Sequence, residues 1–367
     1  MMNVCFLLGG FEGRGGIGRV TSTTINSFSD KDNINVLAVS YVKEKNDSYK
    51  TNENIKRDFL YNDRTSMTKA ILFRNGALKL RKILKKNQID ILIACGVMYL
   101  PLAFLSALGT DIKVMYVEHT NPDIGYDFRF EKAIRTFSAV LSDRIIVISD
   151  AARKWYINKG INKNKIRLIY NSIPEETFSN RDYNPDSTKI ISVGRLTFQK
   201  NFEGLIDIAS RFIKKYPNWI WDIYGDGECK EALEEQIKKN GLEEQVFLRG
   251  NRQNIIEIYK DYAFIAMTSR YEGFPMALIE AAANKLPLLS YDIKTGPNEI
   301  IIDKENGYLI EFEDALEFSK KIEDLIDNPD KRKQMSSKSY QTSQSFHVER
   351  IKKCWLELFH EVNDRKT

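Results

Sequence analysis

The sequence contains little cysteine and histidine, and it shows neither an internal repeat nor a low-complexity stretch. Its four cysteines form no CxxC pair, so neither a zinc site nor a disulfide framework is indicated, and a reduced, cytoplasmic setting is expected. Residues 1–11 lack the basic start of a signal peptide. Hydrophobic residues at 43% and charged residues at 29% exclude wholesale disorder. The net charge is only +5 over 367 residues, which does not indicate a nucleic-acid-binding protein.

One long stretch without charge needs an explanation. Residues 91–109 contain no charged side chain over 19 positions, a length that meets the criterion for a membrane span. However, Gly96 and Pro101 divide the run into a strand-like half, Ile89–Ala94, and a helix-like half, Tyr99–Leu108. Buried parallel strands followed by buried helices produce such runs routinely. We therefore favour a buried strand and helix over a membrane span.

Short apolar runs alternate with amphipathic segments along the whole chain. A first series of predicted strands comprises Asn3–Leu8, Asn35–Val39, Ile89–Ala94, Lys113–Val117, Arg144–Ile148 and Ile166–Ile169. A second series comprises Lys189–Val193, Trp219–Tyr224, Val246–Leu248, Phe264–Met267, Leu286–Ser290 and Gly307–Ile310. This alternation predicts an α/β protein with parallel sheets covered on both faces.

Two series of strands predict two doubly wound domains, residues 1–172 and 173–345, joined through the polar stretch Pro174–Thr188. The tail, residues 346–367, contains one apolar helical face within Phe346–Val362 that must dock on another part of the chain. Open α/β sheets bind ligands beyond the carboxyl ends of their strands. Two such domains therefore predict a ligand site in a cleft between them.

The segment from Glu272 to Glu280 is the most informative motif. Pro275 is predicted to be the first helical residue, because its fixed φ and missing N–H suit that position, and the helix should end near Asn284. A helix start with free N–H groups attracts anions. Carboxylates beside it suit a ligand that carries both phosphate and hydroxyl groups, such as a nucleotide-sugar. Taken alone, two glutamates at this spacing usually lie on a solvated helix face.

Two further segments contain residues suited to binding phosphate. Gly15-Gly16-Ile17-Gly18-Arg19 follows the first strand, where glycines allow backbone N–H groups to approach an anion. It partly matches the dinucleotide fingerprint, but the spacing from the strand and the missing acidic residue at the end of the second strand argue against that reading. A glycine turn with a purely structural role remains an alternative for this segment. After the strand Lys189–Val193, Arg195 and Lys200 could clamp a pyrophosphate or be solvated surface charges.

Three smaller signals complete the set. His119, one of only three histidines, ends the strand Lys113–Val117 and should face the cleft, although a lone histidine is more often structural. The loop from Thr295 to Glu299 either contacts the ligand or caps its own helix. Asp226 invites a metal-binding reading, but it has no histidine nearby and lies in a glycine-flanked pattern that favours a turn.

Together the motifs resemble one known family. GGxGR after the first strand, a strand-end histidine, GRLxxxKN at the start of the second domain and E-x7-E near its end occur in one order. This set resembles the retaining glycosyltransferases of family four, which have the GT-B fold, and the resemblance covers nearly the whole chain. It implies a nucleotide-sugar donor bound mainly by the second domain, an acceptor bound by the first, and a last helix that packs back on the first domain.

The resemblance also implies roles for individual residues. Arg195 and Lys200 would neutralise the diphosphate leaving group in place of a metal, so no metal or other cofactor is expected. Glu280 would hydrogen-bond the ribose hydroxyls. Glu272 would hold the sugar hydroxyls and the phosphate, together with the adjacent segment Gly273, Phe274, Pro275 and Met276.

The remaining roles concern the ends of the donor. Gly16 would abut the donor phosphate, and His119 would contact the sugar near the reacting carbon. Asn251 and Arg252, after the strand Val246–Leu248, would line the base pocket. His119, Glu272, Arg195 and Lys200 are therefore the expected catalytic residues, and front-face transfer with retention is the expected reaction.

The segment SRYEGFPMALIEA is most similar to the corresponding segment of bacterial enzymes that build capsule, O-antigen or other lipid-linked glycans. A UDP-hexose or UDP-N-acetylhexosamine donor and a polyprenyl-diphosphate-linked acceptor are then expected. The basic segment Lys69–Lys86 places Phe73, Ala77, Leu80 and Leu84 on one face, as in a helix that lies on an anionic bilayer or in an ordinary surface helix. Two alternatives remain, namely a non-hydrolysing nucleotide-sugar epimerase and a non-catalytic partner subunit.

Overall fold

The structure is a computed structural model. It describes residues 1–11, 16–29, 32–43, 49–62, 69–120, 122, 129–252 and 254–363, without the side chains of 69–73 and 129–134. The chain divides into two compact units, each of which is described by itself. Unit 1 comprises Met1–Ser172 and Val348–Thr367, and unit 2 comprises Ile173–His347.

Unit 1 contains a parallel sheet of seven strands in the order β3-β2-β1-β4-β5-β6-β7. Its strands are β1 (Met2–Leu8), β2 (Ile34–Val42), β3 (Lys56–Tyr61), β4 (Ile91–Cys95), β5 (Lys113–Glu118), β6 (Arg144–Val147) and β7 (Ile166–Leu168). Its helices are α1 (Gly16–Asn26), α2 (Lys69–Lys86), α3 (Leu100–Ala107), α4 (Arg129–Leu141), α5 (Asp150–Asn158) and α12 (Val348–Asn363). The strand order reverses between β1 and β4, which marks the switch point of a doubly wound sheet.

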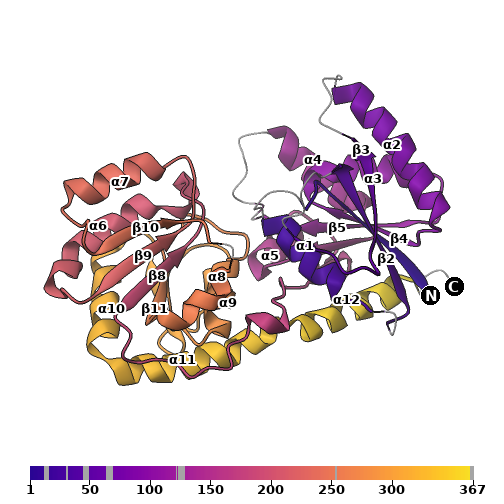
Figure 1. The fold of residues 1–367 in the computed structure, drawn as a ribbon. Coiled ribbons are helices and arrows are strands. Elements are labelled where there is room, and N and C mark those ends of the chain that lie inside the picture. The colour runs from indigo at the N-terminus through magenta and orange to yellow at the C-terminus, as the bar shows by residue number, and fades with distance from the viewer. Residues whose placement is uncertain are drawn as a thin grey trace. The chain divides into compact units, whose positions relative to one another are not determined.

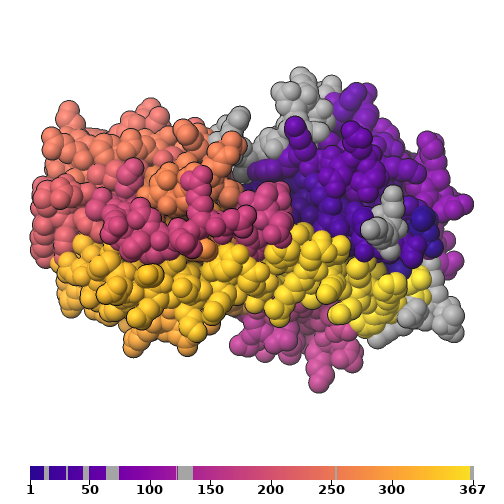
Figure 2. All heavy atoms as spheres, turned by 60° about the horizontal axis from the view of Figure 1, so that its bottom comes forward, coloured from indigo at the N-terminus to yellow at the C-terminus, as the bar shows by residue number. Residues whose placement is uncertain are grey.

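Helices cover both faces of the unit 1 sheet (Figure 1). On one face, side chains of α2, α3 and α5 share a core with alternate strand residues such as Leu7 and Tyr116. On the other face, Trp355 of α12 packs on Phe6 of β1, and Phe359 packs on Phe28, with ring centroids 6.1 and 5.7 Å apart. The apolar face of the last helix is therefore buried against unit 1, while Figure 2 shows its outer side at the surface.

Unit 2 contains a parallel sheet of six strands in the order β10-β9-β8-β11-β12-β13. Its strands are β8 (Lys189–Val193), β9 (Ile220–Tyr224), β10 (Val246–Gly250), β11 (Phe264–Met267), β12 (Leu288–Asp292) and β13 (Gly307–Glu311). Its helices are α6 (Phe202–Phe212), α7 (Lys230–Lys239), α8 (Ile255–Ile258), α9 (Met276–Ala283), α10 (Ala315–Asp327) and α11 (Pro329–Ser343). The order reverses between β8 and β11, so a second switch point lies there.

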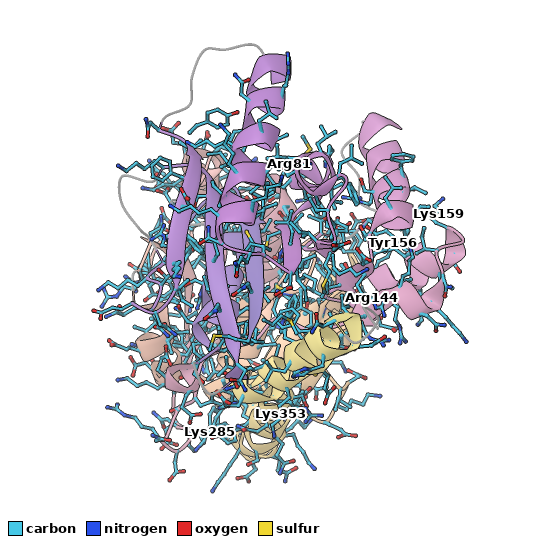
Figure 3. All side chains as sticks on the ribbon, turned by 90° about the vertical axis from the view of Figure 1, so that its right-hand side faces the viewer. Arg81, Arg144, Tyr156, Lys159, Lys285 and Lys353 are labelled. Atoms are coloured by element: carbon cyan, nitrogen blue, oxygen red, sulfur yellow. The ribbon has the colours of Figure 1, made fainter. Side chains whose placement is uncertain are left out.

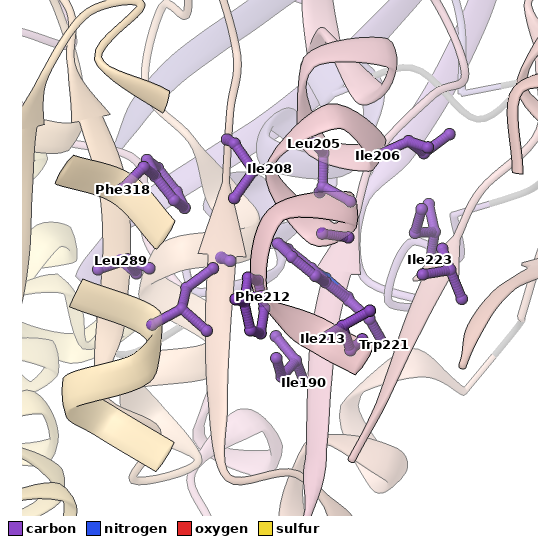
Figure 4. Packing of buried hydrophobic residues seen from close by; sticks show 14 of the residues in the cluster. Ile190, Leu205, Ile206, Ile208, Phe212, Ile213, Trp221, Ile223, Leu289 and Phe318 are labelled. Carbon is purple, nitrogen blue, oxygen red and sulfur yellow. The ribbon is translucent and has the colours of Figure 1, made fainter. Parts of the chain in front are cut away.

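The core of unit 2 is built around Trp221 of β9, which is fully buried (Figure 4). Phe212 of α6 packs on it with ring centroids 6.3 Å apart, and its indole N–H donates to Ser192 Oγ at 3.0 Å. Because the polar edge of the indole has a partner, the large ring can be buried without an unmet hydrogen bond. This core holds β8 and β9 in place and so fixes the loops that leave their carboxyl ends.

The predicted fold class, two doubly wound α/β domains of the GT-B type, is confirmed. One strand was not predicted, because β3 lies at the sheet edge and only Leu60 of its six residues is buried, so the sequence shows no apolar run there. The uncharged stretch 91–109 forms β4, a 3-10 turn (Val97–Tyr99) and α3. No helix of the described residues is long and apolar enough to cross a bilayer.

Candidate active site

The loops after β8 and β11 meet at the unit 2 switch point. Thr268 Oγ1 donates to the Asn201 carbonyl at 2.9 Å, and Asn201 Nδ2 donates to the Thr268 carbonyl at 3.1 Å. Gln199 Nε2 donates to the Tyr271 carbonyl at 2.9 Å. These hydrogen bonds span about 70 residues of sequence and join the two loops into one surface at the carboxyl edge of the sheet.

Lys200 and Glu272, predicted separately, form an ion pair on this surface. Lys200 Nζ lies 2.5 Å from Glu272 Oε1, and Ser269 Oγ donates to the same carboxylate oxygen at 2.7 Å. The side chains of Lys200 and Glu272 are only 17% and 7% exposed. The reading of Glu272 as a residue on a solvated face is therefore wrong, because its carboxylate is buried and already holds a cation in place.

Arg195 is the exposed cation beside this pair. Its side chain is at the surface, and it forms no ion pair or hydrogen bond with any residue in the described part of the chain. The stem of Lys200 lies against Gly194, where an added Cβ would approach Lys200 Cδ to 3.1 Å. Lys200 is thus fixed by the carboxylate of Glu272, whereas Arg195 is available to a ligand.

The turn after β9 packs against the segment that contains Arg195. Gly225 has a φ of +152°, and an added Cβ there would lie 1.8 Å from the Gly194 carbonyl oxygen. The Leu196 N–H donates to the Asp226 carbonyl at 2.9 Å. Asp226 therefore lies in a tight glycine turn, as the sequence pattern favoured, and the glycines permit the close approach of the two backbones.

The predicted helix start lies beside the ion pair, with one correction. α9 begins at Met276, and Pro275 is its N-cap with φ −77° and ψ 99° rather than its first helical residue. The Pro275 carbonyl already accepts from the Leu278 N–H at 3.1 Å, which is the behaviour of an N-cap. Among the described residues no side chain caps this end of the eight-residue helix, so its first N–H groups are oriented for an anion.

The loop after β12 supports this helix start. The Thr295 hydroxyl donates to the Glu272 carbonyl. An added Cβ at Gly296, whose φ is +98°, would lie 2.5 Å from Pro275 Cδ. These contacts support the loop that contains Glu272 and Pro275, a role that neither alternative for Thr295–Glu299 had named.

Glu280 lies in the second turn of α9 and is 1% exposed. Tyr259, also fully buried, donates its hydroxyl to Glu280 Oε2 at 3.5 Å. Gly273 is half-buried and Phe274 is buried, with the Phe274 ring 5.3 Å from that of Phe346. Both glutamates of the E-x7-E motif therefore point into the unit rather than into solvent.

The predicted base-pocket residues follow β10 at the same edge of the sheet. Asn251 and Arg252 are exposed. The preceding Gly250 accepts from the Gly225 N–H at 2.9 Å, so this loop adjoins the turn after β9. The predicted donor-binding residues of unit 2 thus lie on loops that follow β8, β10 and β11 and on α9.

In unit 1 the two predicted residues lie at the ends of β5 and α1. Gly16 is the exposed first residue of α1, and an added Cβ there would meet no atom of the described part of the chain within 4 Å. Gly15, in the same motif, lies outside the described residues. His119 lines a pocket with Phe6, Val117 and Trp355, and its Nε2 has no partner among the residues that the structure describes. Burial lowers the pKa of this imidazole to about 4, so it is neutral at pH 7.

Sequence reasoning missed several residues that build these sites. Ser269 binds Glu272, and Glu118 accepts a network of hydrogen bonds beside His119. The position of Ser269, three residues before Glu272, could have suggested their contact, but the other partner of Glu272, Lys200, lies 72 residues before it in the chain. For Glu118 a strand-end carboxylate beside a histidine was the available signal.

The basic helix was predicted correctly as α2 (Lys69–Lys86), and of the two alternatives for its apolar face the one that places this face on a bilayer is wrong. Ala77, Leu80 and Leu84 are buried in the core of unit 1, so they cannot lie on a bilayer. The side chain of Phe73 lies outside the described residues. Arg81, labelled in Figure 3, donates to the Leu108 carbonyl at 2.5 Å and so joins α2 to the end of α3.

Comparison with known proteins supports a common family for both units. Residues 14–177 match the model "Glycosyltransferase Family 4", and residues 174–342 match "Glycosyl transferases group 1". The amylovoran biosynthesis glycosyltransferase AmsD of Erwinia amylovora is 33% identical over 234 residues, which cover 62% of this chain and 65% of AmsD. The similar segment therefore spans slightly less than two thirds of that relative's length.

Two further proteins are similar over almost their whole length. The GalNAc-alpha-(1->4)-GalNAc-alpha-(1->3)-diNAcBac-PP-undecaprenol alpha-1,4-N-acetyl-D-galactosaminyltransferase of Campylobacter jejuni is 23% identical over 99% of this chain and 100% of its own. The crystal structure of Anabaena Alr3699/HepE in complex with UDP has a TM-score of 0.82 at 19% identity, covering 98% of this chain and all of that one. The two family models together span residues 14–342, and with the 33% identical AmsD they show that the chain belongs to the family 4 type of glycosyltransferases.

Proposed function

We propose that the protein transfers a hexose or N-acetylhexosamine from a UDP-sugar to a glycan acceptor, with retention of the anomeric configuration. The observation that carries this proposal is the buried Lys200–Glu272 pair with Arg195 exposed beside it, at the carboxyl edge where the strand order of unit 2 reverses. Two cations lie on the loop after β8, and the start of α9 follows the loop after β11 that joins it, which suits a diphosphate better than a neutral ligand.

The protein offers groups that complement the diphosphate, the ribose and the base of the donor. The N–H groups at the start of α9 and the two cations suit the diphosphate, and the buried carboxylate of Glu280 suits the ribose hydroxyls. Asn251 and Arg252, on the exposed loop after β10, suit the base. The UDP present in the HepE complex is consistent with a uridine nucleotide.

The proposed reaction breaks the bond between the anomeric carbon and the β-phosphate oxygen. The acceptor oxygen bonds the same face of that carbon, and its proton passes to the departing phosphate oxygen. Negative charge therefore grows on the diphosphate, where preorganised cations contribute most to catalysis. Arg195 and Lys200 supply this charge, and on this proposal no metal is needed, so turnover should persist in excess EDTA.

The proposed acceptor is a glycan carried on a polyprenyl diphosphate, in the synthesis of a bacterial cell-surface polysaccharide. The names of the Erwinia and Campylobacter relatives support this class of acceptor. An enzyme with such an acceptor works at the cytoplasmic face of the membrane, to which this protein would bind peripherally.

The outer surface of α2, α3 and α4 is the proposed membrane contact. Exposed apolar side chains are unusually frequent on it, namely Leu78, Leu105, Leu108, Phe137, Val140 and Leu141. Exposed Arg74, Lys82, Lys85 and Lys86 of α2 add positive charge, which attracts anionic lipids. In liposome flotation, a Lys82→Glu/Lys85→Glu variant should lose binding to anionic vesicles. If the amount of wild-type protein that floats with the vesicles does not depend on the salt concentration, the proposal is contradicted.

Donor binding is the direct test of the proposed function. Thermal-shift screening against UDP-, GDP- and ADP-sugars should show stabilisation by a UDP-sugar, because a ligand that binds only the folded state raises its stability. Glu280→Gln should reduce that shift most strongly. Stabilisation by a GDP- or ADP-sugar alone would refute the uridine assignment. Isomerisation of a UDP-sugar in the absence of acceptor would indicate the epimerase instead.

A further inference from the structure

The carboxylate of Glu118, at the last position of β5, lies at the centre of a buried polar cluster. Glu118 is 2% exposed. Its Oε2 accepts from the hydroxyls of Tyr116 at 2.6 Å and Tyr156 at 2.8 Å, and Arg135 Nε lies 2.9 Å from the same oxygen. These partners come from β5, α5 and α4, and Tyr156 is labelled on α5 in Figure 3. One carboxylate therefore ties three elements of unit 1 together.

The two tyrosines act as donors to this carboxylate. Burial, followed by the charge of Glu118, raises the pKa of both phenols well above the usual range, so both keep their protons. Burying a carboxylate is costly unless a cation and hydrogen bonds compensate it. Here Arg135, whose side chain is 3% exposed, supplies the opposite charge. A core that needed only packing would be served by an apolar residue at this position.

The other carboxylate oxygen reaches past His119 to the next residue. Glu118 Oε1 accepts from the Thr120 backbone N–H at 3.2 Å and from the Thr120 hydroxyl at 2.6 Å. Arg135 Nη2 donates to the same hydroxyl at 3.2 Å. The residues immediately before and after His119 are therefore both held by one buried group.

His119 points to the opposite side of the sheet. Successive side chains of an extended segment alternate between faces, so Glu118 shares a face with Tyr116, and His119 shares one with Val117. Val117 and His119 line the same pocket, together with Phe6 and Trp355. Because the backbone on both sides of His119 is fixed, its direction is fixed as well.

We propose that Glu118 is a positioning residue that holds His119 in its orientation for the sugar of the donor. The proposal rests on the proposed function, in which His119 meets the sugar near the reacting carbon. Glu118 itself touches no substrate. It acts by fixing the peptide that carries His119, and small displacements of a reacting-site group lower turnover strongly without a matching loss of binding.

Glu118→Gln tests the proposal, because the amide keeps the shape but loses the charge and half of the acceptor capacity. The matched control is Glu361→Gln in the same unit. Like Glu118, Glu361 accepts hydrogen bonds from the side chains of more than one residue, here Arg144 and Arg167. However, Arg144 is the first residue of β6, whereas His119 follows the last residue of β5, so the two lie at opposite ends of the parallel strands. Tyr156→Phe removes a single hydrogen bond and serves if Glu118→Gln does not fold.

Two readouts are measured on the full chain. The first is the NMR signal of the His119 Cε1–H, which is one of only three histidine signals and is assigned by its loss in His119→Gln. The second is the rate of UDP release from the UDP-sugar that the wild type accepts, resolved into kcat and KM. Urea unfolding is recorded for every variant.

Glu118→Gln should shift the His119 signal and lower kcat by about 10- to 100-fold, with the donor KM changed by less than about threefold, whereas Glu361→Gln should change neither. An unchanged His119 signal and turnover in Glu118→Gln would overturn the proposal. Equal losses of kcat in both variants, in proportion to lost stability, would also overturn it. If the wild type turns over no UDP-sugar, the proposed function fails, while the NMR comparison still decides whether Glu118 orients His119.

Discussion

Replacing Arg195 by alanine should separate catalysis from folding more sharply than any other change in the site. The side chain is exposed and has no ion pair with any described residue. Surface substitutions of this kind change the free energy of unfolding by about 0.5 kcal/mol or less. If Arg195 stabilises the departing diphosphate, its loss should lower kcat by about 10²- to 10³-fold, or roughly 3–4 kcal/mol of transition-state stabilisation.

The contrast with Lys200→Ala follows from the ion pair. Glu272 is 6% exposed, so removing Lys200 leaves a buried carboxylate with only part of its hydrogen bonding, at a cost of about 1–3 kcal/mol of stability. Lys200→Ala should therefore lower both turnover and stability, whereas Arg195→Ala should lower turnover alone. Arg181, an exposed arginine of the segment that precedes β8, provides the matched control through Arg181→Ala.

The assay combines UDP release from a UDP-sugar with urea unfolding of the same preparations. Turnover of Arg195→Ala within a factor of about three of the wild type would refute the role of this residue in the clamp. A large loss of stability in Arg195→Ala would refute the structural assignment instead, because it would require an ion pair that the described residues do not provide.

Four further outcomes are expected. Ser269→Ala removes one hydrogen bond to Glu272 and should lower kcat by about 3- to 30-fold with little change in donor KM, measured by initial rates. The Cβ added in Gly16→Ala meets no atom of the described residues within 4 Å, so urea unfolding should be unchanged, and a loss of donor affinity in calorimetry would report phosphate contact. Burial lowers the pKa of His119 from 6.5 to about 4, so the unfolded state takes up the proton first as the pH falls, and stability should drop by about 2 kcal/mol between pH 7 and pH 5. His119→Gln should remove that drop in urea unfolding, and an equal drop in both proteins would contradict the assignment. Phe359→Ala opens a cavity beside Phe28, and unit 1 should lose about 3–5 kcal/mol in the same assay.

Local patterns in the sequence were sufficient for most of the elements. Ten or more residues of regular spacing identified α2 and α12, and apolar runs identified the buried strands, because each pattern reflects burial of one face or of a whole strand. The edge strand β3 was missed for the same reason, since only one of its residues is buried. At Leu286–Ser290 the observed strand begins at Leu288, after Pro287, which lacks the N–H that a ladder requires.

For the candidate site, too, local patterns and long-range contacts supplied different parts of the answer. The sequence by itself was sufficient to select the candidate side chains, because glycine-rich turns, a helix start and strand-end polar residues leave local signals at Arg195, Lys200, Glu272 and Glu280. Only the tertiary structure decided that Lys200 and Glu272 bind each other, that the E-x7-E glutamates are buried, and that the apolar face of α2 faces the core. These outcomes depend on contacts between residues far apart in the chain, and a periodic pattern shows that a face is apolar without showing what covers it.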